Sequence, residues 1–591
     1  MTPVPPSASH EEGGALQTQA SEAVKRLDQL YEFDREPVSQ DRLLGPGYFA
    51  GSFAGEHVAA TEFVIGVLFV NWGANIKDIF VGLALGNLMA VLTWTLVCAP
   101  IAVATRLTLY WYFRRIGGPI LTVAYNILNA VLFCILAGCM ITVSASAVRI
   151  PFNIPAQVHW YPDDIRFVLV VLVVGTVVVA VAILGFRALA VFSIVCSPWM
   201  FLMFVVGALV VLPKLGEAAG VGPVQSFGAF WEVAQKVVWT GKTPDGSPPL
   251  GFWKVAAFAW ICNLAMHGGL SDMALFRYAR KASYGLCSAF GMFLGHYLAW
   301  ICAGMMGVGA ALLLKMPLAR LDSGDVGYQV LGWSGILAVI AAGWTTSNPT
   351  LYRAGLALQA ITPNWSRARV TLATGVITTV IACFPFVFTR LLDFVGIYGL
   401  LLAPAGAIVV CEHWIFPRLG LTRYWASDRG LAVNPPALVA WASGVAFAVL
   451  LERTGMLHLF YLFLPVYLLT SIVYILLASV SGARQPTLKS TSLTDTPVSR
   501  QSSAGLSASD SSGPNQFLKN VAGLVALAAL AVSLVFPIWV ALGGIDAFEN
   551  RHDWMKLWLT LPTLIYFVGG TVFFLQREKE HRAEMVTPKK E

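Results

Sequence analysis

The sequence has 591 residues, 57% of them hydrophobic, which is more apolar surface than a water-soluble core can bury. Its net charge of +7 does not indicate a nucleic-acid partner, because the basic residues lie in short loops and tails between apolar stretches. The composition therefore excludes a soluble protein. It predicts an all-α, polytopic membrane protein whose partner is the lipid bilayer.

Apolar stretches of about 20 residues, enough to cross a bilayer core of about 30 Å as a helix, recur along most of the chain. They predict twelve spans in the main body, near 48–72, 79–104, 119–148, 165–185, 188–213, 251–275, 285–314, 331–360, 368–388, 391–411, 433–452 and 456–480. Two more are expected near 519–543 and 555–576. The stretch between these groups is rich in Ser and Thr and poor in aromatic residues, so we expect a disordered linker.

These features divide the chain into a cytoplasmic N-terminal tail (1–45), a twelve-helix membrane domain (46–481), the linker (482–515), two additional transmembrane helices (516–577) and a charged cytoplasmic tail (578–591). Short loops rich in Arg and Lys are retained inside the cell, which places both termini in the cytoplasm of a multi-pass protein of the plasma (inner) membrane. The basic residues counted for this orientation are Arg106, Arg114, Arg115, Arg187, Arg277, Arg280, Lys281, Arg353, Arg367, Arg369, Arg418, Arg423 and Arg429.

Two spans carry polar residues and glycines at mid-membrane depth, where an unpaired polar group is expensive. In the first span these residues are Gly55, Glu56, His57 and Glu62. In the sixth span they are Asn263, His267, Gly268, Gly269 and Asp272. Because glycine weakens a helix by about 1 kcal/mol per position, both segments are expected to unwind.

The two segments lie five spans apart, as corresponding parts of two five-helix halves. This pattern is typical of inverted-repeat transporters with a binding site near mid-membrane. The alternative is that Gly55, Gly268 and Gly269 only permit close helix packing while the acids and histidines pair with one another. We favour a binding site around 55–57 and 267–269, and leave both interpretations open for Glu62.

The eighth span contains a hydroxyl- and amide-rich run, Thr345 to Asn348, directly before Pro349, which would kink a helix. Hydroxyls and freed carbonyl groups suit a small hard cation such as Na⁺. The alternative, which the spacing alone favours, is that these hydroxyls bond back to their own helix.

Across about residues 45–480 the sequence resembles the nucleobase:cation symporter-1 family of purine–cytosine permease-like transporters. The resemblance is carried by the order and spacing of four weak motifs, SFAGEHV (52–58), HGGLSDMALFRYARK (267–281), AGWTT (342–346) and APAGAIVVCEHWIFPR (403–418). It implies a leucine-transporter-type fold, with ten core helices as two inverted five-helix repeats and two peripheral helices. It also implies symport of a nucleobase or related heterocycle, driven by Na⁺ or H⁺.

By position, the resemblance implies a Na⁺ site made by the carbonyl groups of Ala54, His57 and Ala342 and the hydroxyls of Thr345 and Thr346. The substrate positions depart from the family pattern. Phe133 stands where members commonly have a stacking Trp, and Ala137 and Leu351 replace two amides. The resemblance therefore leaves the substrate open, including compounds other than nucleobases.

Our hypothesis is a secondary transporter in which the substrate lies between the breaks of spans one and six. Phe133 and Trp260 would be its aromatic walls, and Glu56 and His267 would read its polar groups. The full candidate substrate set is Gly55, Glu56, His57, Phe133, Trp260, Asn263, His267 and Gly268. A proton carried by His267 or Glu56 is the alternative to Na⁺ as the coupling ion.

Two other classes of protein are a membrane-embedded enzyme and a receptor. An enzyme is not expected, because the sequence has no HExxH, GxSxG or phosphate-loop motif, and no cofactor or metal beyond the coupling ion is expected. A transporter-like receptor that binds a small molecule without moving it remains the alternative function. Tight binding without gradient-driven accumulation would distinguish the receptor from the transporter.

Overall fold

The structure, a computed structural model, describes residues 36–157, 159–183, 186–262, 264, 268–362, 364–385, 387–485 and 515–586. Most of the predicted N-terminal tail and linker lie outside these residues. The described chain is helical apart from turns and two isolated β-bridges. Ten of its helical stretches are long and apolar enough to cross a membrane, or eleven with one bent pair.

The first five spans form one half of the core. The first span consists of α2 (Pro46–His57) and α3 (Thr61–Asn71). The second is continuous and consists of η2 (Asp78–Gly82), α4 (Leu83–Thr93), η3 (Trp94–Cys98) and α5 (Ala99–Thr105). The third to fifth spans are α6 (Leu109–Val148), α7 (Ile165–Ile183) and α8 (Phe186–Val210). The third span begins ten residues earlier than predicted, at Leu109 instead of 119, because α6 continues through a kink. Gly118 has φ +78° there, and Pro119 restarts the helix.

The next five spans form the second half. They consist of α11 (Phe252–Ile261) with η6 (Leu270–Asp272) and α12 (Met273–Phe276), η8 (Phe290–Ala299) with α13 (Trp300–Leu314), α15 (Trp333–Gln359), α16 (Arg367–Ala382) and α17 (Val387–Val410). Of these, α11 is short, with 10 residues, and α15 carries the polar run at its centre. Several helices begin with a polar N-cap residue whose side chain accepts a backbone N–H of the first turn. These residues are Thr108, Asp322, Ser366 and Asn434.

The remaining helices surround this core. Two follow it, α20 (Pro435–Thr454) and α21 (Phe463–Ser481), and three lie at the C-terminus, α22 (Gln516–Leu542), α23 (Phe548–Trp558) and α24 (Thr560–Val586). The last helix continues to Val586, although the span was expected to end near 576. The connections hold short helices, including η7 (Ala282–Cys287), α9 (Leu212–Ala219), α10 (Phe227–Val233), α14 (Ser323–Leu331), α18 (Phe416–Arg418) and α19 (Trp425–Asp428).

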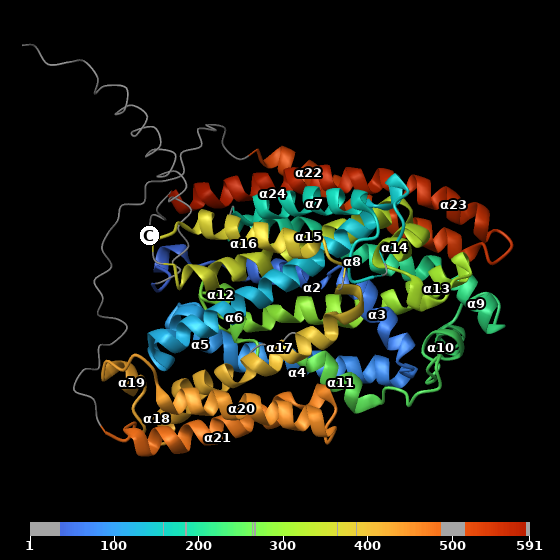
Figure 1. Ribbon diagram of the computed structural model, residues 1–591. Coiled ribbons are helices and arrows are strands. Elements are labelled where there is room, and N and C mark those ends of the chain that lie inside the picture. The colour runs from blue at the N-terminus through green and yellow to red at the C-terminus, as the bar shows by residue number, and fades with distance from the viewer. Residues whose placement is uncertain are drawn as a thin grey trace, which may run out of the picture.

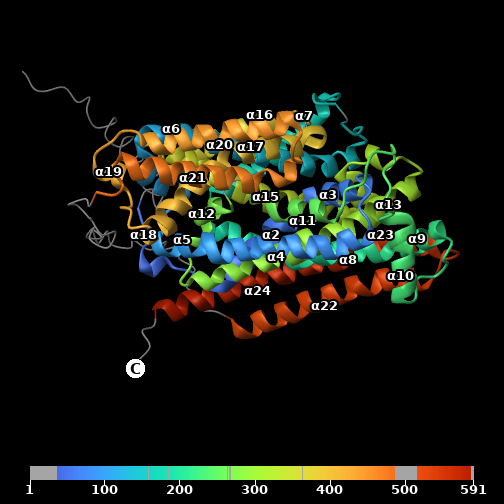
Figure 2. The same ribbon diagram turned by 90° about the horizontal axis from the view of Figure 1, so that it is seen from below.

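The two pairs of outer helices cover different sides of the core. Figure 1 shows α22 and α24, in red, at one edge and α20 and α21, in orange, at the opposite edge, and Figure 2 shows the same separation after a quarter turn. Between them, α6 packs along α15, and α2 packs between α8 and η8. The broken first span is therefore enclosed by core helices.

The C-terminal pair is attached to α8 by specific hydrogen bonds. The indole of Trp199 donates to the hydroxyl of Thr563 at 3.2 Å, and the hydroxyl of Tyr566 donates to the carbonyl of Val195 at 2.7 Å. In both hydrogen bonds the donor residue and the acceptor residue are buried. The added helices thus support the outer side of the helix that α2 packs against.

Candidate functional site

The first span is broken directly after the polar pair Glu56–His57. α2 ends at His57, α3 begins at Thr61, and the two axes are bent by 54°. Residues 58–60 separate them. The end of a helix leaves its last carbonyl groups without intrahelical donors, so the break presents carbonyl oxygens in the middle of the span.

Gly55 lies inside α2, one turn before the break, so the prediction that it unwinds is wrong. Gly51 and Gly55 face α8, where an added Cβ would overlap side chains of that helix. From the other side, Gly291 and Gly295 of η8 approach the last turns of α2 equally closely. Two glycine pairs with four-residue spacing therefore seat α2 tightly between its neighbours, which is the close-packing role of such residues.

The described residues of the sixth span leave the helical conformation at 262, 264, 268 and 269. α11 ends at Ile261, and helical structure resumes at η6 and α12. Gly268 and Gly269 have φ of +66° and +79°, which only glycine adopts readily. Two residues predicted for the substrate site in this gap, Asn263 and His267, lie outside the described residues.

The hydroxyls of the eighth span meet the broken end of the first. Thr346 Oγ1 donates to the carbonyl of Glu56 at 2.8 Å and lies 3.0 Å from the carbonyl of Ala342, within its own helix. Thr345 Oγ1 bonds to the same Ala342 carbonyl at 3.1 Å. The hydroxyls thus bond back to α15, as one interpretation predicted, and one of them also contacts α2.

This junction has the chemistry of a cation site. The carbonyl groups of Ala54 and His57 lie in the last turn of α2, next to that of Glu56, which Thr346 contacts. Carbonyl and hydroxyl oxygens are the ligands that a small hard cation prefers. The five predicted cation ligands therefore belong to two segments that pack against each other.

Beside this junction lies a buried group of three charged side chains. Arg353 of α15 donates to both carboxylate oxygens of Glu56, at 2.5 and 3.1 Å, and also to Asp272 of η6. The second oxygen of Asp272 accepts the indole N–H of Trp94 at 2.5 Å. All three charged side chains are at most 12% exposed. We call Glu56, Asp272 and Arg353 the ion triad.

The ion triad ties the two interrupted spans to the eighth. Glu56 lies at the end of α2, Asp272 lies where the sixth span resumes, and Arg353 lies two turns beyond Thr346 on α15. All four carboxylate oxygens accept a hydrogen bond from a nitrogen. In the ion triad, two acidic side chains share one guanidinium group.

The role of Arg353 corrects the sequence analysis, which counted this residue as a cytoplasmic charge. Arg277, counted in the same way, is also fully buried and donates to the carbonyl of Ala274 and the hydroxyl of Tyr352. The sequence held a usable signal, since Arg353 falls inside an expected span, where charge is rare and usually paired. Its partners are not apparent from the sequence.

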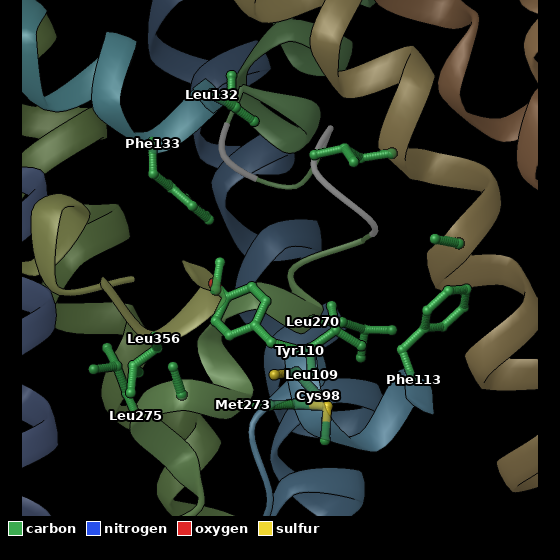
Figure 3. Packing of buried hydrophobic residues seen from close by; sticks show 14 of the residues in the cluster. Cys98, Leu109, Tyr110, Phe113, Leu132, Phe133, Leu270, Met273, Leu275 and Leu356 are labelled. Atoms are coloured by element: carbon green, nitrogen blue, oxygen red, sulfur yellow. The ribbon is translucent and has the colours of Figure 1, made fainter. Parts of the chain in front are cut away.

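The two aromatic candidates lie in different surroundings. The indole of Trp260 donates to Thr93 at 3.1 Å, and its ring lies 6.1 Å from Phe463, which also borders Gly268. Phe133 is 3% exposed, and its ring lies 6.5 Å from that of Tyr110. Figure 3 shows the rings of Phe133 and Tyr110 in the cluster that includes Leu270 and Met273 of the resumed sixth span. Trp260 and Gly268 thus share the neighbour Phe463, while Phe133 belongs to the buried cluster that also holds Leu270 and Met273.

The fold and the site together define a class of protein. Two interrupted helices in equivalent positions of two five-helix halves, with hydroxyls of the eighth span against the first break, constitute the leucine-transporter-type fold that the family resemblance implied. The chain is a multi-span membrane protein of this fold.

Three solved structures with a similar arrangement of helices are of transporters. The chain is similar to Mhp1, a nucleobase-cation-symport-1 family transporter, in a closed conformation with bromovinylhydantoin bound, at 16% identity and a TM-score of 0.58, covering 76% of this chain and 96% of Mhp1. For the inward-facing conformation of Mhp1 the identity is 16% and the TM-score 0.55, and the match covers 76% of this chain and 94% of that one. For a Na⁺-coupled sialic acid symporter in a substrate-bound outward-open state the identity is 12% and the TM-score 0.53, and the match covers 78% of this chain and 96% of that one. These neighbours are transporters and not enzymes, in agreement with the prediction.

No protein-family model matches the sequence, and no curated protein matches it either. The similarity therefore rests on the arrangement of the helices and establishes the fold.

Proposed function

We propose that the chain is a cation-coupled symporter of a small polar heterocycle, such as a nucleobase or a related compound, and that it works by alternating access. The observation that carries the proposal is the hydrogen bond from Thr346 to the carbonyl of Glu56, at the break of the first span. This contact joins the predicted hydroxyl ligands to the predicted carbonyl ligands. The fold shared with Na⁺-coupled and nucleobase–cation symporters supports the same assignment.

In this proposal Na⁺ binds to the carbonyl groups of Ala54, His57 and Ala342 and the hydroxyls of Thr345 and Thr346. A bound cation would replace the hydrogen atom that Thr346 now directs at α2, and would hold α2 and α15 together. The two acids of the ion triad, Glu56 on α2 and Asp272 on η6, share one guanidinium, and their negative charge would favour a cation nearby. Proton coupling through Glu56 or His267 remains the alternative.

The substrate would lie between the breaks of the first and sixth spans, in contact with residues of the set Gly55, Glu56, His57, Phe133, Trp260, Asn263, His267 and Gly268. The carboxylate of Glu56 is engaged by Arg353, so its contribution in this state would be its backbone and its charge. A heterocycle is supported by the bromovinylhydantoin bound to Mhp1.

Coupling follows from the ion triad. Arg353 holds the resumed sixth span and the end of α2 to the helix that carries the cation hydroxyls, so a cation that fixes α2 against α15 also fixes one wall of the substrate site. Cation and substrate would then each raise the affinity for the other by the same factor.

We also propose that both termini face the cytoplasm, with the protein in the plasma (inner) membrane. The N-terminal segment is tied to one end of the bundle by hydrogen bonds from Val38 to Arg106 and from Leu44 to Tyr278. This end carries Arg106 and Arg280, and basic loops are retained inside.

The test is uptake into proteoliposomes. A thermal-shift screen of nucleobases, hydantoins, vitamins and amino acids, with and without Na⁺, first identifies a ligand, because a ligand of the folded state raises its apparent stability. Uptake of that compound should then require an inward Na⁺ gradient.

The Thr346→Ala variant should need about 10- to 100-fold more Na⁺ for half-maximal uptake, since a hydrogen-bonding group lost from a charged partner costs about 1.5–3 kcal/mol. Thr374→Ala is the matched control, because its buried hydroxyl bonds only within α16. Tight binding with no gradient-driven accumulation would favour the receptor, and uptake driven by pH alone would assign coupling to a proton.

A further inference from the structure

A second pair of ionisable side chains lies buried just beyond the first break. Glu62, in the first turn of α3, and His296, in η8, have side chains that are 2% and 4% exposed. The Oε1 atom of Glu62 lies 3.6 Å from Nε2 of His296. The other carboxylate oxygen, Oε2, is buried and has no hydrogen-bond partner among the described residues.

A row of rings connects this pair with the end of α2. The imidazole of His296 stacks on Trp300 at 4.4 Å between ring centroids, and it lies 5.0 Å from the imidazole of His57. His57 is the last residue of α2 and adjoins the carbonyl groups of the candidate cation site. The segment that carries His296 is π-helical, a local form that is frequent at functional sites.

Few other charges face the pair. On the elements packed against α3 and η8, α13 contributes Cys302, α8 contributes Cys196 among its described side chains, and α4 has no ionisable residue. Cys262, at the end of α11, interacts with Glu62. Two charged residues of these neighbours are already paired, Glu56 with Arg353 and Asp325 with Arg149. The third is Arg320, in the short helix Leu318–Arg320 that precedes α14.

An ionised Glu62 would leave one charged oxygen without a donor in an apolar wall, at a high cost. A proton on this carboxyl removes the charge and makes one of its oxygens a hydrogen-bond donor. We infer that the Glu62 carboxyl is a proton-binding site, and that the proton it binds lies beside His296 just beyond the break of the first span.

The binding of this proton does not depend on the proposed function, but its use does. In a cation-coupled transporter, a proton that binds at Glu62, just beyond the first break, would be a second coupled ion. A static carboxylate, held by the N-terminus of α3, is the competing arrangement. It predicts that Glu62 takes up no proton.

The test is infrared difference spectroscopy of the purified full chain in lipid nanodiscs, titrated over pH and repeated in D₂O. A protonated carboxyl has a C=O stretching band that ionised carboxylates lack. In the wild type, we expect such a band to change with pH and to shift on deuteration. Glu62→Gln should remove it, and His296→Gln should displace its pH midpoint by one unit or more.

Glu412→Gln and His413→Gln are the matched controls, because they alter a buried carboxyl and a buried imidazole of a separate cluster with Tyr474 and Tyr112. Neither should affect the Glu62 band. If Glu62→Gln does not fold, the effect of His296→Gln on the wild-type carboxyl still decides the matter.

A band that is independent of pH, that survives Glu62→Gln, or whose midpoint is unchanged in His296→Gln would overturn the inference. The spectra require neither substrate nor Na⁺. Failure of the proton site is therefore distinguishable from failure of Na⁺-driven uptake.

Discussion

The ion triad makes the sharpest stability prediction, because its three members carry unequal numbers of partners. Arg353 pairs with both acids, whereas Glu56 and Asp272 each pair only with Arg353 within the triad. Arg353→Met would leave two buried carboxylates without a counter-charge. Glu56→Gln would leave a neutral Arg353–Asp272 pair. The loss of the cation should therefore cost more than the loss of one anion.

The magnitudes follow from the geometry. Opposite charges about 4 Å apart attract by about 4 kcal/mol at an effective dielectric of 20, and removing one partner of a buried pair costs about 3–5 kcal/mol. Because Arg353 is only 4% exposed, water cannot replace its contacts. We expect Arg353→Met to lower the free energy of unfolding by about 3–5 kcal/mol. Glu56→Gln should lower it by about 1–3 kcal/mol, the cost of its weakened hydrogen bonds.

The assay is unfolding by SDS in mixed micelles, followed by tryptophan fluorescence, for the two single variants and the double variant. Since the double variant removes an acid that Arg353→Met leaves unpaired, its loss should be smaller than the sum of the single losses by about 0.5–3 kcal/mol. Additive losses, or a Glu56→Gln variant less stable than Arg353→Met, would refute the assigned pairing.

Two further predictions concern the packing around the first span. Gly295→Ala should abolish folding or uptake, because its Cβ would overlap the carbonyl of His57, while Gly251→Ala, with open space around it, should behave like the wild type in expression and uptake. Tyr566→Phe should lower the free energy of unfolding by about 0.5–1.5 kcal/mol, the usual net value of one hydrogen bond, and should do so in the same SDS assay. Its control is Tyr328→Phe, at a side chain that is 38% exposed, and an equal loss in both would contradict the role of the C-terminal helices in supporting α8.

The ion triad also changes how the first break is understood. The sequence suggested a segment loosened by Gly55, with Glu56 free to contact a ligand. Instead, glycines fix α2 between α8 and η8, and Arg353 restrains Glu56. The unwound residues are the three that follow. The break is thus a defined joint between two well-packed helices.

The sequence by itself determined the helical membrane class, because runs of apolar residues can satisfy their backbone in lipid only as helices. It also located both interruptions to within a few residues, since glycines and polar side chains at mid-membrane depth are costly wherever they occur. The hydroxyl pair Thr345–Thr346 was recognisable for the same local reason.

Only the tertiary structure decided which of these residues meet. Arg353 is 297 residues from Glu56 and 81 from Asp272, so no local pattern links them. The pair Glu62 and His296 is likewise formed by two helices that become neighbours only when the bundle assembles. The penalty for burying a charge is local and can be read along the chain, whereas the partner that offsets it depends on how the helices pack.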